Sequence, residues 1–428
     1  MIMTGSRILL TLPVALVLVL CLAPMGMGFL IEQTYGSVIE SVRENPQNAF
    51  SISGEFDQGL WSSSSVTRIE WPTGESVELD QDWIHGPVPL GELFRGRSPL
   101  DWVFAVVEAT LDSQSESWPQ VAASEEGRPL LESGARIYFD RSVHVHFAFA
   151  PMEHGDSSLT SEGVWGEGRI TSGPEARVQG DIRFGRTTLG GLGQLAWDGA
   201  VLSLDRRLDD QGLTNLDLSL DVGELQLFQS TFEKAEFGMV FRRVDPSATQ
   251  ALSTALDGLD GSALSEEERL AARDQILAEQ LPIVLRGSPE IELSRLALRS
   301  PHNELEIGAR VAVDGSVPEL LSNPMFALGL VQAEARVAAS RSLVEPLLDL
   351  YLAGQMAQTE QAEGLSEADL AEMAAFMREA TLGALIAGKR LVVEEDQFRA
   401  DLEFDGGVLI LNGEMMDPTQ LSNPLSSM

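Results

Sequence analysis

The stretch TNLDLSLDV, residues 214–222, decides the fold of this chain. Its leucines, Leu216, Leu218 and Leu220, alternate with polar residues, so the two kinds of side chain point to opposite faces of an extended strand. Strict alternation favours an antiparallel sheet with one buried and one solvated face over a parallel sheet. The apolar phase shifts by one residue at Gly223, which predicts a β-bulge there.

The same period of two recurs on both sides of this stretch. Towards the N-terminus it marks residues 143–149 and a hairpin across residues 50–71. Towards the C-terminus it marks residues 305–313 and a closing hairpin across residues 398–411, whose turn contains two glycines. The sequence therefore predicts a long antiparallel sheet that occupies most of the chain. A meander of this length is expected to curve or to split into two stacked sheets.

Three segments change to a helical period. Ser265 and Glu268 form a capping box ahead of the first segment, and Pro282 is predicted to end it. Two further amphipathic segments follow between residues 342 and 387. Each carries one apolar stripe, so we expect the helices to lie on a sheet face. The predicted fold class is α+β and β-dominated, with amphipathic helices packed on a curved antiparallel sheet.

A second decisive stretch is ILLTLPVALVLVLCLAPMGMGFLI, residues 8–31, which contains no charged side chain. As a helix it would rise roughly 36 Å, more than the roughly 30 Å of a bilayer's hydrocarbon core. Arg7 precedes it and Glu32 is the first charge after it, which predicts that the N-terminus stays in the cytoplasm. The alternative is a cleaved signal peptide, but the apolar run through Ile31 is longer than such peptides need, which favours an uncleaved anchor.

These patterns divide the chain into three parts. Residues 1–31 form a cytoplasmic stub and a transmembrane signal anchor. Residues 32–245 form a β-rich part, and residues 246–428 form a part of helices and strands that continues the same sheet. Both later parts are expected across the membrane from the N-terminus, tethered by this anchor.

Composition excludes one class of partner. The 428 residues carry a formal net charge of −36, and the only lysines are Lys234 and Lys389. Such a charge repels nucleic acid, so no nucleic-acid partner is expected. An acidic surface also keeps a protein soluble in a salty medium; cation capture or docking to a basic partner is the functional alternative. The single cysteine, Cys21, lies inside the predicted anchor, so no disulfide can form in the exported part.

Motifs for catalysis are scarce. The sequence contains neither a Gly-x-Ser-x-Gly elbow nor a phosphate-binding loop, and no cofactor is expected. The best candidate for a metal is the pair His144 and His146, which an extended strand places on one face. Two imidazoles can chelate zinc if further ligands converge on them. The simpler interpretation is two exposed histidines on the solvated face of a sheet.

The segment HGPVPL gives the chain a family resemblance. His85, Gly86, Pro87 and Pro89, preceded by GLWSS at residues 59–63, resemble the YdgA family of Gram-negative bacteria. Two further segments resemble the same family, LPIVLRGSP at residues 281–289 and LNGEM at residues 411–415. The resemblance implies an inner-membrane-anchored periplasmic protein of unknown function and carries no catalytic residue. The two prolines forbid a helix, so we expect the motif to fix a rigid chain crossing. The alternative for His85 is a ligand or acid–base role.

The leading functional hypothesis is therefore a non-enzymatic binding or scaffolding module of the cell envelope. Its sheet would present an apolar groove to lipid or to a protein partner. The alternative is a metal-dependent periplasmic hydrolase that uses His144 and His146.

Overall fold

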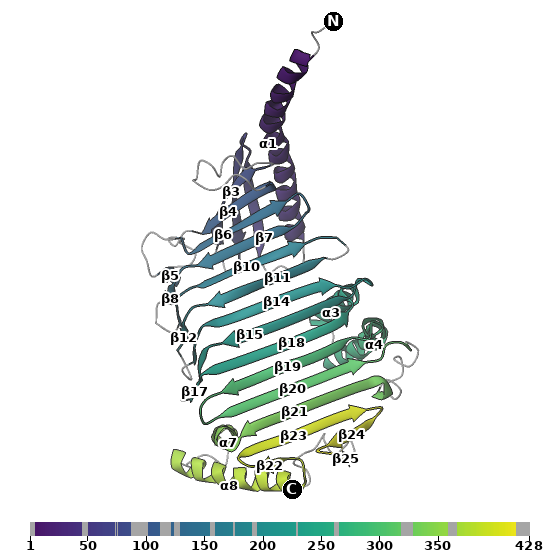
Figure 1. The fold of residues 1–428 in the computed structure, drawn as a ribbon. Helices are drawn as coiled ribbons and strands as arrows, with labels where there is room; N and C mark the ends of the chain where they lie inside the picture. Colours follow the sequence, from purple (N-terminus) through teal and green to yellow (C-terminus); the bar gives the residue numbers. More distant parts are fainter. Residues whose placement is uncertain are drawn as a thin grey trace. The chain divides into compact units, whose positions relative to one another are not determined.

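The computed structural model describes residues 5–44, 50–72, 74, 76–86, 102–111, 121–123, 129–154, 159–173, 176–190, 195–227, 230–260, 265–317, 328–357 and 366–416. The chain divides into two compact units, residues 1–200 and residues 201–428. The boundary predicted at residue 245 lies inside the second unit, where strands give way to helices. Both units are dominated by antiparallel strands, which confirms the predicted β-dominated class (Figure 1).

The N-terminal helix α1 (Gly5–Glu44) contains the whole apolar stretch of residues 8–31 and continues beyond it. Its C-terminal half packs on the first strands of the first unit, and Ile31 and Ile39 are buried there. Within the part of the chain that the structure describes, no helix has both the length and the apolar character that a bilayer crossing requires. The transmembrane anchor stays a prediction.

The first unit is built on one antiparallel sheet in which consecutive strands pair with each other (Figure 1). In order of pairing the strands are β1 (Ser51–Asp57), β2 (Ser62–Glu70), β3 (Ser76–His85), β4 (Val103–Leu111), β6 (Leu131–Tyr138), β7 (Val143–Phe149), β10 (Val164–Thr171) and β11 (Arg177–Phe184). This meander contains the predicted first hairpin and the predicted strand at residues 143–149.

Short strands form a second antiparallel row in the same unit, in the order β5 (Val121–Ala123), β8 (Met152–His154), β9 (Leu159–Ser161), β12 (Thr187–Leu189) and β13 (Leu195–Asp198). They lie in the connections between the long strands. The chain therefore leaves one sheet for the other at several hairpin ends.

The second unit repeats the architecture with another antiparallel meander (Figure 1). In order of pairing its strands are β14 (Ala200–Leu208), β15 (Thr214–Val222), β18 (Lys234–Val244), β19 (Glu290–Arg299), β20 (Glu304–Val313), β21 (Val331–Ser340), β23 (Gln397–Asp405), β24 (Val408–Leu411) and β25 (Glu414–Met416). The short strand β22 (Val392–Glu394) pairs with the first half of β23, and η1 (Leu328–Leu330) is a turn of 3₁₀-helix before β21.

The β-bulge predicted at Gly223 is wrong. Strand β15 ends at Val222, and the residues after Gly223 form β16 (Glu224–Leu227), which pairs with β17 (Ser230–Phe232) outside the long meander. The alternation of apolar and polar residues also shifts by one position when the chain passes from one sheet to another. A bulge within one strand is therefore not the only cause of such a shift. The pairing of β15 with β18 is irregular elsewhere, between Thr214 and Leu216.

Helices interrupt the second meander twice. The first pair is α3 (Pro246–Asp260) and α4 (Glu266–Leu285), and the second is α7 (Arg341–Ala357) and α8 (Glu367–Ala387). Helices pack against each other within each pair, and α7 also contacts β21. The capping boxes that precede α4 and α8 are both present.

Pro282 does not end its helix as predicted, because α4 continues through it to Leu285. A proline removes one backbone hydrogen bond and crowds the carbonyl of the preceding turn. Only three residues of helix follow Pro282, so the disturbance is confined to the final turn.

Candidate functional site

The second unit carries one continuous apolar sheet face, which follows from the register of its strands. Leu218 pairs with Met239, Phe241 with Ile291, and the same face continues across β20, β21 and β23. We call this surface the apolar face. It comprises Leu216, Leu218 and Leu220 of β15, Phe237, Met239 and Phe241 of β18, Ile291, Leu293 and Leu296 of β19, Ile307, Ala309 and Val311 of β20, Ala333, Ala335 and Val337 of β21, and Leu402 and Phe404 of β23.

The opposite face of the same strands carries paired charges. Arg310 donates to Glu290 at 2.7 Å, and Arg242 lies 2.8 Å from Asp217. The carboxylate of Glu236 faces three cations on neighbouring positions, Lys234, Arg295 and Arg299, and the hydrogen bond from Lys234 contributes most to lowering the pKa of Glu236. These cross-strand ion pairs lie on one side of the sheet, and the apolar face lies on the other.

The apolar face is closed at one end and open at the other. At the closed end the strands continue into Ala339 and Phe398, which are buried beside α7, and the guanidinium of Arg341 lies 5.4 Å from the Phe398 ring centroid. At the open end Ile291 and Val311 are cross-strand neighbours and remain 46% and 43% exposed. Large neighbouring β-branched side chains that stay this exposed mark a surface able to take an apolar ligand.

The family-motif residue His85 lies at the end of β3 and is 1% exposed. Its Nε2 atom lies 2.9 Å from Ser63 Oγ, and its buried Nδ1 atom has no hydrogen-bond partner among the described residues. Burial lowers the pKa of His85 below its usual value, and the nearby carbonyl groups of Leu60 and Pro24 offset this only in part. The lowered pKa favours the neutral form of this enclosed imidazole ring.

Gly86 explains why the motif needs glycine after the histidine. A Cβ atom on residue 86 would lie 1.8 Å from the Val103 carbonyl oxygen, and the Gly86 amide donates to the Phe104 carbonyl at 2.9 Å. The backbone of β3 thus runs directly against the start of β4. Pro87 and Pro89 lie outside the described residues. The structural role of the motif stays a prediction.

The helix α1 meets the strands β3 and β1 through one close contact each. Gly28 of α1 faces His85, and Gly54 of β1 faces the Tyr35 ring. The Tyr35 ring centroid lies 5.5 Å from that of Phe56 and 6.2 Å from that of Trp83. Glycine at the two contact positions allows a histidine and a tyrosine ring to approach the opposing backbone.

Buried polar side chains of β2 lie beneath the helix. Tyr35 Oη is 2.9 Å from Thr67 Oγ1, Ser65 Oγ donates to Gln81 Oε1 at 2.6 Å, and Trp83 Nε1 donates to Ser65 Oγ at 2.9 Å. Each of these polar groups is satisfied by a neighbour, so the network fixes the position of α1 on the sheet.

His144 and His146 share one face of β7, as predicted. Their cross-strand neighbours are Arg136 and Arg169 for His144, and Gly134 and Glu167 for His146. Two guanidinium groups beside His144 oppose a bound cation. Among the described residues no group of three or more potential ligands could hold a metal ion.

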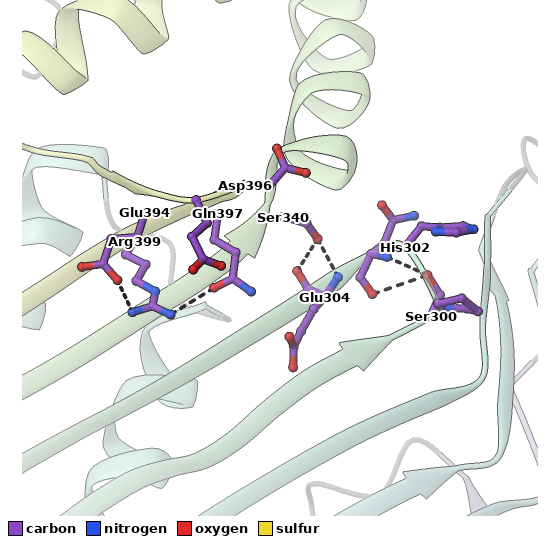
Figure 2. A pocket seen from close by; sticks show the side chains of 11 residues that line it. Ser300, His302, Glu304, Ser340, Glu394, Asp396, Gln397 and Arg399 are labelled. Atoms are coloured by element: carbon purple, nitrogen blue, oxygen red, sulfur yellow. Dashed lines mark hydrogen bonds and ion pairs between the residues drawn. The ribbon is translucent and has the colours of Figure 1, made fainter.

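A polar pocket of about 500 Å³ lies where the turn between β19 and β20 meets the end of β21 (Figure 2). Its groups are paired with one another: Ser340 Oγ donates to the Glu304 carbonyl at 2.9 Å, and Arg399 donates to both Glu394 and Gln397. Figure 2 shows His302 on the turn, apart from the carboxylate of Glu304. The pocket is open, and its side chains form no pair of nucleophile and base.

A family model described as a bacterial protein of unknown function, DUF945, matches residues 6–184 and 179–419. The chain belongs to this family. No curated protein and no solved structure matches the chain. The matched residues extend over both units and include those of the apolar face and of the His85 motif.

Proposed function

We propose that this protein is a YdgA-like module of the cell envelope that binds the acyl chains of a lipid on its apolar face and catalyses no reaction. One observation carries the proposal: the apolar face runs across six neighbouring strands, β15 to β23, and is open around Ile291 and Val311. A sheet face of this breadth is normally covered by other elements of a domain.

The energetics favour an apolar ligand. Fully burying an exposed Val, Leu, Ile or Phe side chain stabilises a complex by roughly 1.5–3 kcal/mol. Ile291, Val311 and Val337 are each more than a third exposed, so a ligand that covers them gains a part of this energy at every position. The face offers no hydrogen-bonding side chain among its defined residues, which favours hydrocarbon over a polar ligand.

The proposed location is the periplasmic side of the inner membrane, with residues 8–31 as a single-pass anchor. The support is the absence of charge in this stretch and the position of Arg7 before it. A tether of this kind would hold the apolar face near a bilayer, which is a source of acyl chains.

Extraction of the purified full-length protein with organic solvent, followed by mass spectrometry, tests the proposal. We expect at least one lipid per protein chain, retained after extensive washing in a mild detergent. As the control, the variant Ile291→Asn/Val311→Asn should retain the fold and lose most of this lipid. Equal lipid content in the variant and the unmodified protein would contradict the proposal, and a protein of constant mass in place of lipid would assign the face to a protein partner.

A further inference from the structure

Arg206 lies on the same side of the second unit's sheet as the apolar face. In β14, Leu202 pairs with Leu220, Leu204 with Leu218 and Arg206 with Leu216. Since Leu216, Leu218 and Leu220 belong to the apolar face, the register places Arg206 on the same side. Arg206 is exposed.

Arg206 also stands at the open end of that face. Leu216 pairs with Phe241, Phe241 with Ile291, and Ile291 with Val311, so one cross-strand row leads from Arg206 to the most exposed apolar side chains. Neighbouring strands lie about 4.8 Å apart, so this row spans roughly 19 Å from β14 to β20. A cation at one end of a row of apolar side chains matches an amphiphile with an anionic head.

The neighbouring arginines are held differently. Arg207 points to the opposite face and lies 3.8 Å from Asp217, and Arg310 is paired with Glu290. Among the described residues no hydrogen bond or ion pair holds the guanidinium of Arg206. Its charge is therefore available to a ligand, whereas those of Arg207 and Arg310 are already matched by carboxylates.

We propose that Arg206 binds the carboxylate of a long-chain fatty acid whose hydrocarbon chain lies along Phe241, Ile291 and Val311. A guanidinium and a carboxylate form two parallel hydrogen bonds, which is the strongest geometry available to this side chain. The net charge of −36 disfavours head groups with several negative charges, so a singly charged head is the best match. This inference rests on the proposed function and specifies its ligand.

Photocrosslinking of the full-length protein tests the inference. The probes are palmitic acid with a diazirine at the middle of its chain and the alcohol of the same chain and diazirine position. Both are added to the unmodified protein, to Arg206→Gln, to Arg206→Lys and to Arg207→Gln, all in the same detergent. Labelled peptides are identified by mass spectrometry, and the labelling of peptides that contain Phe241, Ile291 or Val311 is measured against probe concentration.

We expect the Arg206→Gln variant to need at least about tenfold more of the acid for half-maximal labelling, since the charge-assisted hydrogen bonds to the carboxylate are lost. The Arg206→Lys variant should lie between, and Arg207→Gln should match the unmodified protein. The alcohol should label all four proteins equally, which also shows that the variants are folded. Equal labelling of the unmodified protein and Arg206→Gln by the acid would overturn the inference alone. Failure of both probes to label these peptides in the unmodified protein would overturn the proposed function as well.

Discussion

Gly28 of α1 lies against the imidazole ring of His85 at the end of β3, and a Cβ atom on residue 28 would come within 2.5 Å of His85 Cε1. Pro24, one turn earlier in the helix, is fully buried. The last part of the apolar stretch of residues 8–31 therefore packs on protein. In the proposed anchor of residues 8–31, the contact between Gly28 and His85 would join the sheet directly to the end of the membrane-spanning helix.

Replacing Gly28 by alanine should weaken the attachment of α1. Alanine is the better helix former by about 1 kcal/mol, but the new methyl group would force the His85 ring to move and cost about 1–3 kcal/mol. The free energy of unfolding, measured by denaturant titration with tryptophan fluorescence, should fall or at best stay constant. Gly36→Ala is the matched control because no atom lies within 4 Å of its added Cβ, and this variant should gain stability. A gain of equal size in both variants would show that the contact between Gly28 and His85 is absent.

The stability of the first unit should depend on pH through His85. Burial lowers the pKa of His85 in the folded state, so the unfolded chain binds the proton more readily. The free energy of unfolding should therefore be fully present above the unfolded-state pKa of about 6.5 and fall as the pH is lowered through that value towards the folded-state pKa. In the His85→Gln variant this part of the pH dependence should vanish, while replacement of the exposed His302 should leave it unchanged. A pH profile that is identical in the His85→Gln variant and the unmodified protein would contradict the buried, neutral state of His85.

The hydrogen bond between Tyr35 and Thr67 should contribute to the docking of α1. Loss of a buried neutral hydrogen bond costs about 1 kcal/mol, so Tyr35→Phe should destabilise the first unit by about this amount. In a double-mutant cycle with Thr67→Val the two effects should be smaller than additive, because both remove the same interaction. The control is Ser37→Ala, since the Ser37 hydroxyl donates to the Thr34 carbonyl of its own helix. Strict additivity in the cycle would show that Tyr35 and Thr67 do not interact.

An ion pair between Arg378 of α8 and Asp349 of α7 should hold the second helix pair together. The side chain of Arg378 is only 18% exposed, so its removal would leave a partly buried carboxylate without its partner. Arg378→Ala should increase hydrogen exchange in residues 341–357 and 367–387 and leave the exchange of β18 and β19 unchanged. Arg341→Ala, at the start of α7, is the comparison that removes a more exposed charge. Unchanged exchange in both helices of Arg378→Ala would contradict a role for this pair.

The sequence was sufficient to predict the strands with a strict period of two, including β15, β20 and the hairpin of β23 and β24. It was not sufficient at Gly223, because a shift of phase does not reveal which strand becomes the new partner. It also failed at Pro282, where the cost of one lost backbone hydrogen bond is small near a helix end. The capping box of Ser265 and Glu268 before α4 was predicted correctly because it depends on residues only three positions apart.

The candidate site was predicted in part. Alternation indicated an apolar sheet face, but its open and closed ends depend on where α7 packs, which is a long-range contact. The family resemblance indicated His85. Its contact with Gly28 could not be predicted, because the apolar stretch of residues 8–31 would look the same whether lipid or protein covered it. The position of Arg206 beside the apolar face could not be predicted. In the sequence it is a single cation that interrupts the alternation of apolar and polar residues in the strand of residues 200–208.

The most direct test of the account places a photoreactive amino acid at Val311, on the apolar face, and in a second protein at Ala312, the next residue on the opposite face. Both proteins are irradiated in living cells, purified at full length and weighed by mass spectrometry. The account predicts an added mass of one lipid on the Val311 variant and none on the Ala312 variant. An unlabelled Val311 variant, or a crosslinked protein at this position, would contradict the claim that the apolar face binds lipid.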